Sequence, residues 1–115
     1  MDRKLQAVLA NNARRLRVLK RKTQREIAVM AGLSQKTISN LESPASPMSP
    51  KLATVEAVAT CFRLHPAILL LDGVTDEALT DRQVGIMIEN FAQLSEYRKR
   101  QVIELISDFS NLEKK

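Results

Sequence analysis

The sequence predicts an all-α protein, a five-helix bundle followed by two C-terminal amphipathic helices. Three observations predict this fold class. Apolar residues recur at helical spacing along most of the 115 residues. The chain has only three glycines, too few for many tight β-turns. Aromatic residues make up 3% of the sequence, which argues against an aromatic-rich β-sandwich.

The first helix is expected over residues 4–21. Its apolar residues form one stripe: Leu5, Val8, Leu9, Ala13, Leu16 and Leu19. A second helix is expected to begin after Thr23, because Glu26 follows three residues later and completes a capping box.

Residues 23–42 are the most informative part of the chain, because they predict two short helices joined by a tight turn. Gly32 interrupts the first apolar pattern, and Ser34 is a suitable N-cap for a helix over residues 35–42. Ile38 and Leu41 would point inward. The outward positions carry amides, hydroxyls and one lysine: Gln35, Lys36, Thr37, Ser39 and Asn40. Amides can pair with adenine, and lysine suits guanine or phosphate, so this face predicts reading of double-stranded DNA.

The order of residues in this segment resembles the lambda-repressor/Cro-like helix-turn-helix family of phage and bacterial transcriptional regulators. The resemblance extends over roughly residues 7–71 and is carried by a set of matching positions: Leu16-Arg17, Gln24, Glu26-Ile27-Ala28, Gly32, Ser34-Gln35, Ile38-Ser39, Leu41-Glu42, Leu52, Val55, Val58-Ala59, Phe62, Leu64, Pro66 and Leu69. The chain departs from the family at Arg21-Lys22, where Gly-Leu is usual, and after Glu42, where a glycine is common.

The resemblance implies roles for individual residues. Base contacts would come from the helix over 35–42, through Gln35, Lys36, Thr37 and Asn40. Backbone contacts would come from residues near the two helix starts: Gln24, Ser34, Arg21, Lys22 and Arg25. Gln24 would also brace Gln35, while Ser34 would serve either as a cap alone or as a phosphate donor as well. Arg17 and Glu42 would form a structural ion pair rather than bind DNA.

The rest of the chain predicts a loop and four more helices. Residues 43–50 contain three prolines and three serines and cannot be helical throughout; they would be docked or form a mobile arm. Helices are expected over 52–62, with Leu52 and Phe62 on the buried face, and over 66–71, ending before Gly73. Thr80 with Gln83 would cap a sixth helix and Ser95 a seventh. We therefore divide the chain into a DNA-binding domain, 1–73, and a C-terminal helical region, 74–115.

Charge is distributed unevenly along the chain. Residues 1–42 carry ten Lys/Arg and three Asp/Glu, a balance of +7, whereas residues 43–115 carry eight and ten, a balance of −2. The basic excess coincides with the predicted DNA-reading segment, as phosphate neutralisation requires.

Other classes of function find little support. One histidine and one cysteine do not make a metal site, and no catalytic or cofactor motif is present, so we expect no enzyme and no cofactor. No apolar run approaches the length of a membrane span, and the single Cys61 suits a reducing compartment. We expect a cytoplasmic bacterial protein, located on the nucleoid through DNA binding.

The leading hypothesis is a sequence-specific regulator, by family habit a repressor, that binds a palindromic operator as a homodimer formed through residues 74–115. These helices could instead pack on their own bundle. The alternative function is an antitoxin whose C-terminal helices bind a toxin protein. A third is a protein-interaction module without DNA function, against which the basic charge argues.

Overall fold

The computed structural model describes residues 4–114, without the side chain of Arg82, and these residues form helices and no strand. Their order along the chain is α1 (Lys4–Leu19), α2 (Gln24–Ala31), α3 (Gln35–Leu41), α4 (Leu52–Cys61), the 3-10 helix η1 (Pro66–Leu70), α5 (Asp76–Thr80), α6 (Arg82–Ala92) and α7 (Glu96–Glu113). The all-α prediction is confirmed. The chain divides into two compact units, one ending at Gly85 and one beginning at Ile86.

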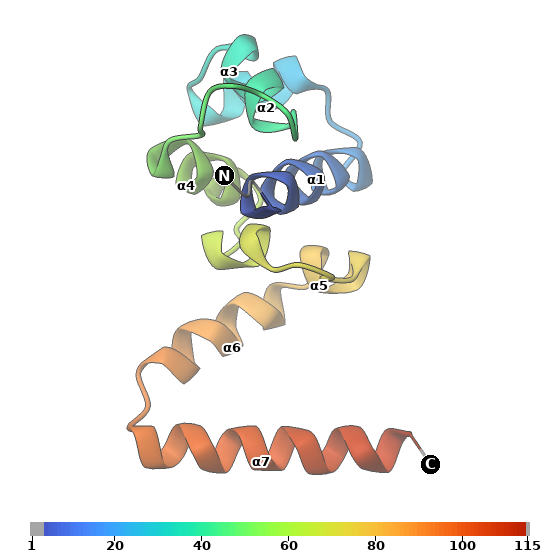
Figure 1. Ribbon diagram of the computed structural model, residues 1–115, viewed down its shortest axis with the longest axis vertical. Coiled ribbons are helices and arrows are strands. Elements are labelled where there is room, and N and C mark those ends of the chain that lie inside the picture. The colour runs from blue at the N-terminus through green and yellow to red at the C-terminus, as the bar shows by residue number, and fades with distance from the viewer. Residues whose placement is uncertain (1–3, 115) are drawn as a thin grey trace. The chain divides into compact units, whose positions relative to one another are not determined.

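In the first unit, α1 lies at the centre of the packing (Figure 1). It contacts α3, η1 and α5, while α4 packs against both α2 and η1. The largest fully buried side chains come from five elements, α1, α2, α3, η1 and α5: Leu16, Ile27, Ile38, Leu41, Ile68, Leu69 and Leu79. Burying such side chains contributes roughly 1.5–3 kcal/mol each. This core fixes α2 and α3 on one side of α1, with η1 and α5 on the other (Figure 1).

Three helices end in the same way, with a residue in the left-handed region. After α2, Gly32 has φ +70°, and the amides of Gly32 and Leu33 donate to Val29 and Ala28. This pair of bonds is a Schellman motif, in which glycine is the usual left-handed residue. After α1 and α4 the same two bonds form around arginines, Arg21 (φ +57°) and Arg63 (φ +55°).

The end of the first helix therefore differs from the prediction. The helix stops at Leu19 instead of continuing to residue 21, because the chain reverses at Arg21. The predicted apolar stripe of this helix also included a residue that is not buried. Leu9, Ala13 and Leu16 are buried, but Leu5 is 59% exposed. Similarly, Leu52 was predicted to be buried and is 83% exposed, because it lies in the first turn of α4.

The region after Gly73 contains one helix that was not predicted. Thr75 caps α5 by accepting a hydrogen bond from the amide of Ala78, and Leu79 is fully buried. The predicted Thr80–Gln83 capping box is wrong. The Thr80 hydroxyl donates back to the carbonyls of α5, and the Asp81 carboxylate accepts from the Gln83 amide. The division at residue 73 stays a prediction, although α5 packs on α1 and η1.

The second unit comprises most of α6 and all of α7. Ser95 caps α7, as predicted, by accepting a hydrogen bond from the amide of Arg98 at 3.3 Å. Large apolar side chains remain exposed along both helices, among them Met87, Leu105 and Phe109.

Candidate nucleic-acid interface

The first helix of the motif begins at a complete capping box. The Thr23 hydroxyl accepts from the amide of Glu26 at 3.1 Å, and the Glu26 carboxylate accepts from the amide of Thr23 at 3.0 Å. The hydrogen bonds from the Thr23 backbone and side chain hold the pKa of Glu26 below its ordinary value, with a smaller contribution from Lys22. The box fixes the start of α2, where free backbone N–H groups favour an anion.

The turn at Gly32 sets the entry to α3. Ser34 caps α3 as predicted, because its hydroxyl accepts from the amide of Thr37 at 3.1 Å. The two hydroxyls, Ser34 Oγ and Thr37 Oγ1, also lie 2.8 Å apart and share a hydrogen bond. Ile38 and Leu41 are each 1% exposed and anchor α3 to the core. The orientation of α3 is therefore fixed at its cap and along its buried face.

The outward side of α3 divides into two groups of residues. Gln35, Lys36 and Ser39 are exposed to solvent. Thr37 and Asn40 are half-buried and face a pocket beside α4. The predicted base-reading residues thus share one short helix, but of the four only Gln35 and Lys36 are exposed to solvent.

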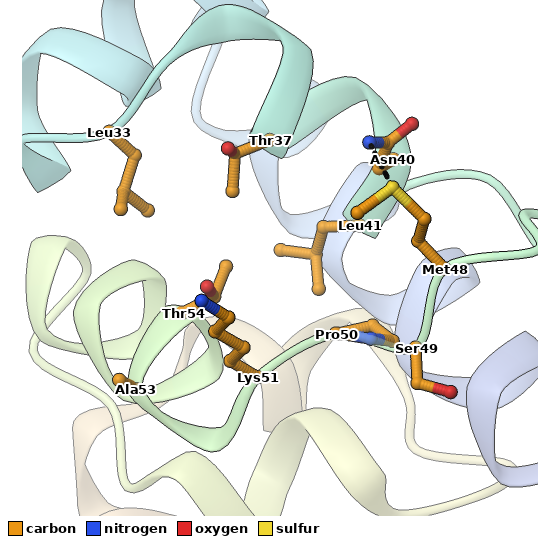
Figure 2. A pocket seen from close by; sticks show the side chains of 10 residues that line it. All are labelled: Leu33, Thr37, Asn40, Leu41, Met48, Ser49, Pro50, Lys51, Ala53 and Thr54. Atoms are coloured by element: carbon orange, nitrogen blue, oxygen red, sulfur yellow. Dashed lines mark hydrogen bonds between the residues drawn. The ribbon is translucent and has the colours of Figure 1, made fainter.

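The pocket has a volume of about 370 Å³ and lies between α3, the start of α4 and the loop that joins them (Figure 2). Leu33, Thr37 and Leu41 face it from above in this view, and Ala53 and Thr54 from below.

The proline-rich loop between α3 and α4 is docked and not a free arm. Ser46 is 6% exposed, and its carbonyl accepts a hydrogen bond from Gln6 Nε2 at 3.0 Å, which ties the loop to α1. At the pocket rim, Asn40 Nδ2 lies 3.9 Å from Met48 Sδ (Figure 2). The loop therefore forms a fixed wall beside the C-terminal half of α3.

Arg17 links α1 to the end of α3. Its Nε lies 2.8 Å from Glu42 Oε2, its Nη2 lies 3.0 Å from Oε1, and its Nη1 donates to the carbonyl of Lys22 at 2.9 Å. The Gln24 amide also donates to Glu42 Oε1, at 3.3 Å. Among the described hydrogen bonds, Gln24 therefore contacts Glu42 and not Gln35, the residue that the resemblance implied.

A family comparison agrees with this geometry, since residues 14–69 match the family model described as helix-turn-helix. The segment is a helix-turn-helix domain of the lambda-repressor/Cro-like family. This assignment supports a DNA-binding transcriptional regulator. No curated protein and no solved structure shows significant similarity to the chain. Within the described residues, no helix is long and apolar enough to cross a membrane, and no cluster of side chains is suited to a metal ion.

The basic residues around the helix-turn-helix are not equivalent. Arg21 and Arg25 are exposed near the start of α2. Lys22 is half-buried, with its Nζ 4.0 Å from Glu26 Oε2. Arg15, which precedes them on α1, donates to the carbonyl of Val74 and forms an ion pair with Asp76 at 3.1 Å. Charge count alone therefore overstates the cations available to DNA.

Sequence reasoning missed the role of Arg15, because it missed α5. A signal was present: Thr75 is followed by Asp76 and Glu77, an N-cap with acidic residues in the first turn. It also missed the pocket, whose walls come from three separate segments and leave no local pattern.

Proposed function

We propose that this protein is a transcriptional repressor that binds a palindromic operator as a homodimer and reads it with α3. The observation that carries the proposal is the exposed N-terminal end of α3. Gln35 and Lys36 stand free there, on a helix held rigidly by its Ser34 cap and by Ile38 and Leu41. The N-terminal residues of a recognition helix are those that enter the major groove.

In this proposal, Gln35 pairs with adenine and Lys36 with guanine or a nearby phosphate. Thr37 and Asn40 contribute from the side that faces the pocket. Backbone contacts come from the start of α2 and the cap of α3: Gln24, Ser34, Arg21, Lys22 and Arg25. Arg21 and Arg25 rank first among these, because both are exposed.

Palindromic DNA requires two copies of the domain, related by a two-fold axis. The exposed apolar residues of the C-terminal helices support a homodimer formed there. Repression would follow where the operator overlaps a promoter, since the bound dimer would exclude polymerase. Such a protein needs no catalysis and no cofactor, and DNA binding would hold it on the nucleoid of a bacterial cytoplasm.

The direct test is selection of genomic DNA fragments by the purified protein at near-physiological salt, followed by sequencing of the bound pool. We expect an inverted repeat to be enriched. Gln35→Ala and Lys36→Ala should each weaken binding to that site by roughly 1–3 kcal/mol and relax the preference at one position of each half-site. Ser39→Ala is the matched control, because Ser39 is exposed on the same helix and is assigned no contact.

Binding without sequence preference would contradict the proposal. Recovery of a second small protein with the C-terminal helices from the native host, together with such nonspecific binding, would favour the antitoxin alternative.

A further inference from the structure

Helix α7 (Glu96–Glu113) has 18 residues, and none of them is buried. Its large apolar side chains are exposed, including Leu105 (54%), Ile106 (49%) and Phe109 (58%). In proteins, most of the stability of an amphipathic helix comes from tertiary packing of its apolar face. The helix therefore needs a partner surface, and the order of its residues indicates which one.

The apolar residues that define its central stripe are symmetric about the midpoint of the helix. At 100° per residue, Val102, Leu105, Ile106 and Phe109 fall on one face, within an arc of about 100°. Reversing the helix end to end about the point between 105 and 106 exchanges Val102 with Phe109, and Leu105 with Ile106. An apolar residue thus replaces an apolar residue at every position of this stripe.

Opposite charges occupy the two ends of the same face. Arg98 lies on the stripe towards the N-terminus and Glu113 towards the C-terminus, at equal distances along the sequence from the midpoint. Both side chains are exposed, and the Arg98 guanidinium contacts Gln101 and the ring of Tyr97, both on its own helix. About 22 Å of helix separates the two charges, which exceeds the Debye length in physiological salt, so they do not neutralise each other within one chain.

We propose that α7 pairs with α7 of a second copy in antiparallel orientation about a two-fold axis near residues 105 and 106. Arg98 then faces Glu113 of the partner subunit, and Val102 packs against Phe109 of the partner subunit. Parallel pairing would instead place like charges together at both ends. The inference rests on the homodimer of the proposed function and specifies its interface.

The test uses the whole chain and measures the dimer dissociation constant by analytical ultracentrifugation without DNA. Arg98→Glu and Glu113→Arg should each raise this constant about tenfold, because each replaces two attractive contacts of the dimer with two repulsive ones. The double variant Arg98→Glu with Glu113→Arg should restore the original value. Mixing the two single variants should yield heterodimers in preference to either homodimer. Arg100→Glu is the matched control, since it makes the same charge change on the opposite face.

The antiparallel pairing would be overturned if the single variants had the same dissociation constant as the unaltered protein. It would also be overturned if the double variant had a higher dissociation constant than either single variant. A protein that stays monomeric at all concentrations would overturn it as well. The DNA selection experiment on the unaltered protein separates this outcome from failure of the proposed function. If the unaltered protein enriches an inverted repeat but the charge variants have unchanged dissociation constants, only the antiparallel pairing of α7 is rejected. If the dissociation constants of the variants change as expected but no operator is enriched, the pairing of α7 is supported and the proposed regulatory function is rejected.

Discussion

Arg17 and Glu42 form a bidentate ion pair that joins the last turn of α1 to the end of α3. Their side chains are 17% and 5% exposed, so the pair is largely removed from water. Gln24, in the first turn of α2, donates to the same carboxylate. One carboxylate therefore connects all three helices that would present the domain to DNA, although it lies at the end of α3 opposite to Gln35.

The first prediction concerns this pair. Arg17→Ala should lower the free energy of unfolding by about 3 kcal/mol, because it leaves the buried Glu42 carboxylate without its main partner. Arg14→Ala is the control, since Arg14 is exposed on the same helix and should change stability by less than about 0.5 kcal/mol. Urea denaturation followed by circular dichroism measures both. Equal stability of the two variants would show that the pair does not support the fold.

The second prediction concerns the two arginines that end helices in the left-handed region. Arg21→Gly and Arg63→Gly should each raise stability by up to about 1 kcal/mol, because glycine removes a steric penalty of about 1–2 kcal/mol and loses roughly 0.5–1 kcal/mol through chain entropy. Thermal unfolding of the single variants tests this.

The opposite substitution at Gly32, from glycine to a residue with a side chain, tests the same argument. A Cβ at Gly32 would meet no atom within 4 Å, so Gly32→Ala should destabilise through its φ alone. A gain in stability from Gly32→Ala, or a loss from both arginine variants, would contradict the argument from backbone strain.

The same helix ends show what could be predicted from the sequence. The start of α2, the turn at Gly32 and the cap at Ser34 were predicted correctly, because residues within three or four positions determine each of them. The end of α1 was not, because Arg21 occupies a position that usually reveals itself by a glycine. A Schellman motif around arginine depends on the packing that follows it and leaves no local signal.

Burial and side-chain pairing were harder to predict than helix positions. Helical spacing identified the face of α1 that packs, but not how far the neighbouring elements cover it, so Leu5 was wrongly placed in the core. At the candidate site, spacing placed Thr37 on the outward face of α3. It could not reveal that the Thr37 hydroxyl bonds with Ser34, since this depends on the rotamers of two side chains.

The third prediction concerns acid stability. Because hydrogen bonds with Thr23 lower the pKa of Glu26 in the folded state, its ionised form stabilises the fold above the pKa of the unfolded chain. That contribution is lost as the pH falls below the ordinary value of 4.5 and through the lowered pKa of the folded protein. Glu26→Gln keeps an acceptor for the Thr23 amide but does not titrate.

The measurement compares the free energy of unfolding at about pH 6 and about pH 3 for the two proteins. The decrease should be smaller for Glu26→Gln than for the unaltered protein. An identical decrease would mean that the capping box makes no contribution to acid sensitivity.

The fourth prediction separates basic residues that bind DNA from those that support the fold. Arg25 is exposed at the start of α2, whereas Arg15 is held by the Val74 carbonyl and Asp76. Arg25→Ala should reduce the slope of log affinity against log salt by about 0.9 per domain, because one fewer phosphate is neutralised. It should weaken binding to all sequences alike and leave thermal stability nearly unchanged.

Arg15→Ala removes the same charge and should behave in the opposite way. Its salt slope should match that of the unaltered protein, while its melting temperature falls because Asp76, at the start of α5, loses its ion-pair partner on α1. Titrations of a labelled duplex at several salt concentrations, with melting curves of the same samples, measure both quantities. If the two variants lose the same salt slope, net charge rather than position governs binding, and the assignment of Arg25 to a phosphate contact is wrong.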